Sequence, residues 1–179
     1  MSEDEGRFEA ELAAWTADAR AAEAAEERLR RHHFAQQERE SATITGILVE
    51  LAELGGTAEL HLRQGSLAGV VSGVGPDVVE VRTSAGTALV PRGAVVAVTS
   101  ERIGAGDAIP RDPRTLAARL AGLVESGSFV TVRLADAEWK GTIVSVGVDV
   151  VVLEWEQRIA ALALDAVLAV MVPAPAQWE

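Results

Sequence analysis

Cysteine is absent from the 179 residues, which excludes disulfides, thiol catalysis and cysteine-based zinc sites. No apolar run approaches the ~18 residues that a membrane-spanning helix needs, and the acidic start MSEDEGRFE does not resemble a signal peptide. We therefore expect a cytoplasmic protein. Aromatic residues make up only 4% of the chain, and its net charge of −11 opposes nonspecific binding to nucleic acid or anionic lipid.

Motifs of the common enzyme classes are also missing. The chain has no glycine-rich phosphate loop, no nucleophile elbow and no convincing Ser/His/Asp set. Asp77 and Asp149 occupy matching positions, and paired acids can do acid–base work, but turn chemistry explains them better. His32 and His33 are adjacent, whereas metal-binding histidines on a helix stand three or four residues apart. We expect a non-enzymatic protein without metal, cofactor or small-molecule substrate.

The dominant positive feature is an internal repeat. Residues 58–100 align without a gap on residues 130–172 when the sequence is shifted by 72 positions, and Gly69 then falls on Gly141. The tripeptide Asp-Val-Val recurs at the same offset. Self-similarity at a fixed period indicates one structural unit used twice.

Each copy of the repeat predicts a helix followed by five short strands. In the first copy, apolar residues at helical spacing end at Gly55-Gly56, and the period then changes to the alternation of strands. Gly69 and Gly141 each lie inside a second strand, where they predict a sharp bend without room for a side chain. The alternation places these residues in the two cores: Leu60, Leu62, Val70, Val79 and Val95, and then Val132, Leu134, Ile143, Val151 and Val167.

The predicted organisation is mainly β with helices (α+β): two tandem five-stranded small barrels, each preceded by a helix, plus a long N-terminal helix. Ser41 or Thr43 can cap the first repeat's helix, and Asp112 the second's, with Pro113 in its first turn. The expected domains are an N-terminal charged helix at 1–40, a first barrel at 41–100, a linker at 101–112, a second barrel at 113–173 and a tail at 174–179.

The segment 1–40 is rich in Ala, Glu and Arg, which favour helix. Phe8, Leu12, Trp15 and Leu29 follow one seven-residue rhythm and form a single apolar stripe. This stripe indicates either a short coiled coil or partner-docking helix, or a solvated helix packed loosely on its own barrel.

A family resemblance rests on the second copy and on one segment of the first. The helix followed by VTVRLADAEWKGTIVSVGVDVVVLEWEQRIAALALDAVLAVMVP resembles the Sm-like (LSm/Hfq-type) fold, and LVPRGAVVAV resembles the Arg-Gly segment of that family's second motif. The whole layout also resembles an uncharacterised bacterial family with an N-terminal Ala/Glu-rich helix. The resemblance covers about two thirds of the chain. It implies small barrels that join in rings and bind uridine-rich or adenine-rich RNA.

The residues that would bind RNA match this family only in part. Arg92-Gly93 matches the second motif, but its counterpart is Leu164-Asp165, and neither copy has the polar pair of the first motif. Residues 41–179 hold ten Lys or Arg against sixteen Asp or Glu, so phosphate contacts are disfavoured. The candidate nucleic-acid contacts are Arg92, Gly93, Arg28, Arg30 and Arg31.

Protein association is the expected function. Trp139 and Trp155 could stack on a partner, although Glu138, Glu154 and Glu156 flank them, and Phe8, Leu12 and Trp15 are further candidates. We therefore expect an interaction or scaffold protein that assembles through strand edges and the N-terminal helix, by self-association or with a protein partner. The alternative is an RNA-binding or nucleic-acid-associated regulatory protein.

Overall fold

The structure is a computed structural model that describes residues 20, 23, 26–31, 33 and 42–174. The chain divides into two compact units, 1–41 and 42–179. In the first unit, the described residues contain a short helical stretch at 26–31, in which Glu26 and Arg30 form an ion pair of 3.0 Å. The described residues therefore do not contain the long N-terminal helix expected over 1–40, and most of that segment lies outside them.

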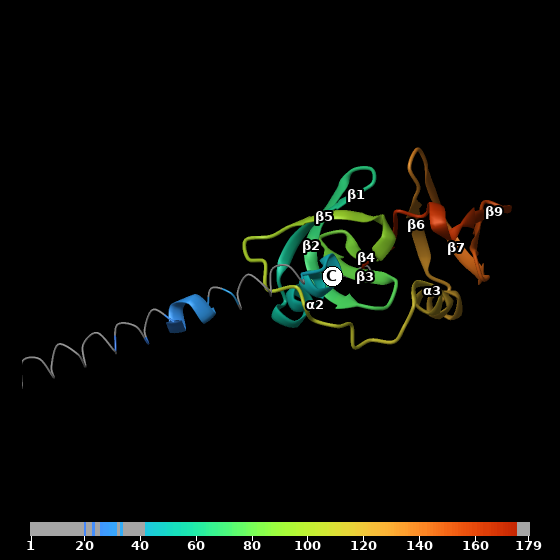
Figure 1. The fold of residues 1–179 in the computed structure, drawn as a ribbon. Coiled ribbons are helices and arrows are strands. Elements are labelled where there is room, and N and C mark those ends of the chain that lie inside the picture. The colour runs from blue at the N-terminus through green and yellow to red at the C-terminus, as the bar shows by residue number, and fades with distance from the viewer. Residues whose placement is uncertain (1–19, 21–22, 24–25, 32, 34–41, 175–179) are drawn as a thin grey trace, which may run out of the picture. The chain divides into compact units, whose positions relative to one another are not determined.

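The second unit is built on one antiparallel sheet of ten strands (Figure 1). The first repeat supplies α2 (Ile44–Leu54), β1 (Thr57–Leu62), β2 (Ser66–Val74), β3 (Val78–Thr83), β4 (Gly86–Pro91), the 3-10 turn η1 (Arg92–Ala94) and β5 (Val95–Thr99). The second supplies α3 (Leu116–Glu125), β6 (Phe129–Arg133), β7 (Glu138–Val146), β8 (Val150–Trp155), β9 (Arg158–Ala163), η2 (Leu164–Ala166) and β10 (Ala169–Pro173).

The prediction of two separate barrels is wrong, because the two repeats share this sheet. Its strand order is β5-β1-β2-β3-β4-β10-β6-β7-β8-β9. The last strand, β10, pairs with β6 on one side and with β4 of the first repeat on the other, where Val170 lies opposite Leu89. Two strands that would each have been an exposed edge satisfy each other's backbone groups in this way.

The hydrophobic cores also cross the junction between the repeats. The cluster under the first repeat includes Leu168 and Ala169 from the second. The cluster under the second repeat includes Val78 and Leu89 from the first. Apolar side chains of each repeat therefore pack in the core of the other, and the two repeats form one packed unit.

Eight of the ten predicted core residues are confirmed as buried, while Val70 and Leu134 are only half-buried. The difference at Val70 comes from the alternation of β2. Leu67 lies opposite Leu60 of β1, a fully buried residue, so Leu67, Gly69 and Val71 face the core while Val70 faces the other side. Val71 is indeed fully buried.

The prediction that the two strand glycines leave no room for a side chain is confirmed. A Cβ atom added at Gly69 would lie 2.4 Å from the carbonyl oxygen of Arg82, and one at Gly141 would lie 2.6 Å from that of Glu154. Both contacts are with the backbone of the next strand, so the neighbouring strands approach each other closely here.

The cap predicted for the first repeat's helix is confirmed at Thr43, whose side chain accepts a hydrogen bond of 2.9 Å from the Gly46 N–H. The cap predicted at Asp112 is wrong. The second helix, α3, is capped by Thr115, and the Leu116 N–H donates to Oδ1 of Asp77 at 2.8 Å. A carboxylate of the first repeat thus completes the helix start of the second.

Asp112 belongs instead to an ionic cluster that joins the repeats. Arg119 of α3 donates to Glu80 of β3 and, at 2.9 Å, to Asp112, while its side chain is only 7% exposed. Arg114 donates to the same carboxylate at 2.8 Å. These hydrogen bonds from Arg114, helped by the charge of Arg119, hold the pKa of Asp112 well below its ordinary value.

The connection between β5 and α3 crosses the first repeat's helix. The Thr43 N–H donates to the carbonyl oxygen of Gly106 at 2.9 Å, and the Gly106 N–H donates to Glu50 at 2.7 Å. The connection is therefore fixed to α2.

None of the helices described is long and apolar enough to cross a membrane.

Candidate interaction site

The sheet ends in two edge strands that use only one side of their backbone. Within the described residues, β5 pairs only with β1, and β9 pairs only with β8. Every other strand has a neighbour on each side. An unpaired strand edge presents a row of N–H and C=O groups to any further strand of suitable length.

Both edges carry exposed apolar side chains. Val96 of β5 is 55% exposed, and Ile159 of β9 is 75% exposed. Soluble proteins commonly protect a sheet edge with charge, proline or a covering loop. The apolar composition of these edges is typical of a strand that takes a partner.

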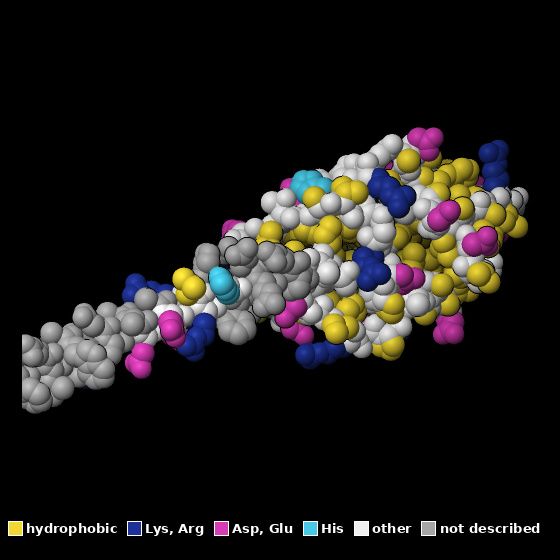
Figure 2. Space-filling view, in the orientation of Figure 1, with side chains coloured by type: hydrophobic (Ala, Val, Ile, Leu, Met, Phe, Trp, Pro, Cys, Tyr) yellow, Lys and Arg dark blue, Asp and Glu magenta, His cyan; other side chains and the backbone are white. Residues whose placement is uncertain are grey.

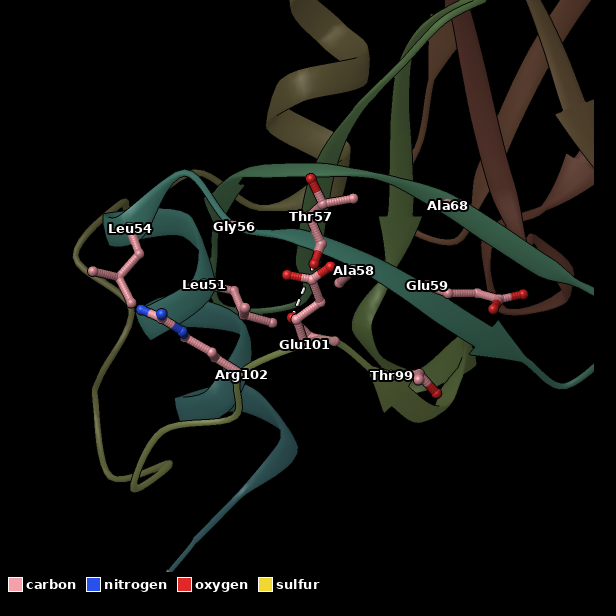
Figure 3. A pocket seen from close by; sticks show the side chains of 11 residues that line it. Leu51, Leu54, Gly56, Thr57, Ala58, Glu59, Ala68, Thr99, Glu101 and Arg102 are labelled. Carbon is pink, nitrogen blue, oxygen red and sulfur yellow. Dashed lines mark hydrogen bonds between the residues drawn. The ribbon is translucent and has the colours of Figure 1, made fainter.

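A groove of about 690 Å³ lies beside the β5 edge. Figure 3 shows its walls: the end of α2, the start of β1, and the segment that follows β5. Leu51 and Leu54 form the apolar wall, and Glu101 and Arg102 are charged residues of the lining. Since Leu54 is 79% exposed, this wall is open to a partner.

The predicted Arg-Gly segment lies in η1, at the end of β4. The Nη1 atom of Arg92 donates to Oγ1 of Thr45 at 3.2 Å, and the Gly93 carbonyl accepts from Nη2 of Arg63 at 3.0 Å. The guanidinium group of Arg63 therefore reaches this turn, while that of Arg92 extends from it toward α2. Both already donate to groups of the protein, so their remaining donors are the ones that could face a phosphate.

Basic side chains do not gather elsewhere on the visible face of residues 42–174. In Figure 2 the Lys and Arg side chains of this unit stand singly among hydrophobic and acidic ones. In the first unit, Arg30 and Arg31 pair with Glu26 and Glu27 on the same helical stretch, and Arg28 lies between them.

The predicted aromatic contacts are exposed and lie on one face of the second repeat. Trp139 of β7 is 43% exposed and Trp155 of β8 is 51% exposed. Trp155 lies opposite Arg158 in the β8–β9 hairpin, whose tip is Glu156-Gln157, both with positive φ. This hairpin therefore presents an aromatic and a cationic side chain together at the β9 edge.

The remaining predicted contacts, Phe8, Leu12 and Trp15, lie outside the described residues. Within the described part of the chain, no group of His, Asp and Glu side chains could hold a metal ion.

The sequence patterns did not identify the β5 edge, the β9 edge or the groove. The repeat nevertheless contains a pattern that could have identified the edges, because residues at equivalent positions of the two copies differ in polarity. Met171, Val172 and Pro173 of β10 correspond to Thr99, Ser100 and Glu101 at the other edge. Such a polarity change indicates which copy of a strand is covered and which faces solvent.

No model of a known protein family matches the chain, and no curated protein matches it in sequence.

Proposed function

We propose that this protein is a non-enzymatic scaffold that assembles by adding strands to the two unpaired edges of its sheet. The observation that carries the proposal is the β4–β10 junction, in which the same two kinds of edge already pair with each other inside the chain. Strand addition derives its affinity from main-chain hydrogen bonds and its specificity from the side chains at the edge. The exposed apolar side chains of β5 and β9 are the ones that would determine this specificity.

Light scattering of the purified full-length chain at several concentrations tests this proposal. A mass above that of one chain, 18.8 kDa, that rises with concentration is the expected result. A ratio of absorbance at 260 and 280 nm typical of pure protein should accompany it. A single-chain mass at every concentration would count against self-assembly.

RNA binding is the second candidate function, and it is favoured by Arg92 of η1 and by Arg63, whose guanidinium group donates to the Gly93 carbonyl of the same turn. The acidic balance of residues 41–179, ten basic against sixteen acidic side chains, disfavours it because phosphate contacts need clustered cations. Fluorescence anisotropy with uridine-rich and adenine-rich oligomers distinguishes the two functions. We expect no binding tighter than about micromolar at physiological salt. Nanomolar binding that is lost in Arg92→Ala but kept in Leu164→Ala would replace the scaffold proposal.

A further inference from the structure

The connection that leaves the first repeat covers one face of α2. A Cβ atom added at Gly46 would lie 1.9 Å from the Gly106 carbonyl oxygen, so the two backbones are in contact there. The Gly106 N–H donates to Glu50 at 2.7 Å, and Arg111 forms an ion pair of 3.5 Å with Glu53. This face of α2 is therefore occupied by a segment of the same chain.

The corresponding face of α3 has no such cover among the described residues. Shifted by 72 positions, Gly46 and Val49 correspond to Ala118 and Ala121. Gly46 and Val49 are buried, whereas Ala118, Ala121 and the neighbouring Gly122 are exposed. We call these three residues the open face of α3. It is open at the positions where α2 is covered.

The two helices are set on their repeats in the same way, so the comparison of their faces is direct. Each helix is capped by a threonine at the equivalent position. The strand that precedes each outgoing segment also has the same register, with Val98 of β5 opposite Leu60 and Val170 of β10 opposite Val132. The chain therefore leaves β5 and β10 at equivalent places relative to α2 and α3.

The segment that follows β10 corresponds to the beginning of the connection. Ala174, where the described residues end, corresponds to Arg102, and Trp178 corresponds to Gly106. Four residues in an extended conformation reach about 13 Å. The connection arrives at α2 within this length, so the segment 175–178 is long enough to arrive at α3.

We propose that residues 175–179 dock on the open face of α3 in their own chain, with the indole ring of Trp178 covering it. This docking goes beyond the proposed function and does not depend on strand-edge assembly. The segment reads Pro-Ala-Gln-Trp-Glu, in which Trp178 is the one large apolar side chain. An aromatic side chain buries about 150–250 Å² when it is covered, so a single indole ring matches a face made of methyl groups and a glycine.

The sizes of the facing side chains change together between the two repeats. The first repeat has Glu50 on the helix and Gly106 on the segment that crosses it. The second repeat has Gly122 on the helix and Trp178 on the segment. A Cβ atom added at Gly122 would meet nothing within 4 Å. The large side chain thus passes from the helix to the segment, and the space that it needs is open.

The backbone contact of the first repeat cannot be copied in the second. Gly106 has φ of +76°, a conformation that residues with side chains rarely adopt. Ala118 also places a methyl group where Gly46 allows the two backbones to touch. A segment that crosses α3 must therefore stand further from the helix, and the long side chain of Trp178 spans the wider gap.

Contact quenching of a fluorescent label tests the proposal, because the chain contains no cysteine and one can be placed at will. Full-length Glu125→Cys carries bimane at an exposed position in the last turn of α3. Tryptophan quenches bimane at contact range, so adding Trp178→Ala should abolish quenching at this position. The same label on Asp136→Cys, exposed at the β6–β7 turn, is the matched control and should not respond to Trp178→Ala. An unchanged signal at position 125 would overturn the inference.

A variant on the helix provides an independent measurement. Gly122→Glu gives α3 the side chain that α2 has at this place, and it should displace Trp178 and abolish quenching of the label at position 125. Gly122→Ala adds one carbon and also raises helix propensity, so it should leave the label quenched. A label that stays quenched in Gly122→Glu would put Trp178 somewhere other than the open face and would overturn the contact. Far-UV circular dichroism of each labelled chain confirms that the sheet is intact.

Mixing distinguishes docking within one chain from docking between copies. Labelled Glu125→Cys with Trp178→Ala is mixed with an excess of unlabelled wild-type chain, and its fluorescence should not fall. A fall would show that the segment of one copy docks on α3 of another, and it would overturn the inference. These measurements do not involve β5 or β9, so their failure leaves the scaffold proposal standing, and a single-chain mass by light scattering would overturn that proposal alone.

Discussion

Replacing Gly141 by alanine should destabilise the sheet, although alanine is ordinarily the better residue in ordered structure. The added Cβ would lie 2.6 Å from the Glu154 carbonyl oxygen and 3.1 Å from its carbonyl carbon. These atoms belong to the backbone of β8, so either strand must move. Overpacking of this kind costs about 1–3 kcal/mol, while the restricted unfolded chain returns about 0.4–1 kcal/mol. The net loss should be about 1–2 kcal/mol.

Two other glycines turn this expectation into a rank order. At Gly69 the added Cβ would lie only 2.4 Å from a backbone oxygen, so Gly69→Ala should lose more than Gly141→Ala. Gly122 is exposed in α3 and has nothing within 4 Å of an added Cβ. Gly122→Ala should therefore gain about 0.5–1 kcal/mol from helix propensity alone.

Urea unfolding followed by far-UV circular dichroism measures all three variants at one protein concentration. We expect a single transition with an unchanged slope and a shifted midpoint. If Gly141→Ala unfolds at or above the wild-type midpoint while Gly122→Ala behaves as expected, the close approach of β7 and β8 is refuted.

Four further expectations follow from the contacts across and beyond the junction. Asp112→Asn should destabilise the chain at neutral pH, and the difference should shrink as the pH falls below about 4, because the depressed pKa of Asp112 gives stability that is lost on protonation; urea midpoints across pH test this. Asp77→Ala removes the carboxylate that accepts from the Leu116 N–H at the start of α3, and it should cost about 1 kcal/mol in the same assay. Leu89→Ala should cost about 2–5 kcal/mol and still give one transition, since that side chain is shared between repeats. Deleting residues 1–40 should lower the assembly mass or abolish a pull-down partner without changing the circular dichroism of the sheet, and loss of the sheet signal would make this segment part of the core.

Because of the internal repeat, most of the secondary structure could be predicted from the sequence. Strand positions follow from alternation, and a glycine inside each second strand predicts the lack of room for a side chain at Gly69 and Gly141. The offset of 72 positions is more informative than alternation at one position of the core. The prediction that Ile143 is buried is confirmed, and the residue of the first copy that corresponds to Ile143 is Val71, which is fully buried, and not Val70.

The joining of the repeats could not be read in the same way. Alternation specifies which face of a strand is buried, but not which strand lies at its free edge. The β4–β10 pair depends on sterically permissive residues such as Gly86 and on long-range packing of Leu168. The predicted cap at Asp112 is wrong for a related reason: Asp112 is a suitable residue near the helix start, whereas the structure uses Thr115 and, from 39 positions before Leu116, Asp77.

Individual residues of the candidate site could be predicted from the sequence, but the surfaces to which they belong could not. Trp139 and Trp155 are exposed, as a partner contact requires. Arg92 keeps its place at the end of β4, but its hydrogen bond to Thr45 joins it to α2. The two edges and the groove arise from strand order, which no local pattern encodes.

The position of β10 has a consequence for synthesis on the ribosome. The core of the first repeat includes Leu168 and Ala169, which leave the ribosome only after the whole first repeat and most of the second have been translated. The first half thus emerges with an incomplete core and with the β4 edge unpaired, for the whole time needed to translate the second half. An N-terminal domain usually folds as soon as it is made; here the native fold of the first half must wait for the last strand. Slow translation of the second half would lengthen the interval in which two nascent chains can exchange their β10 strands.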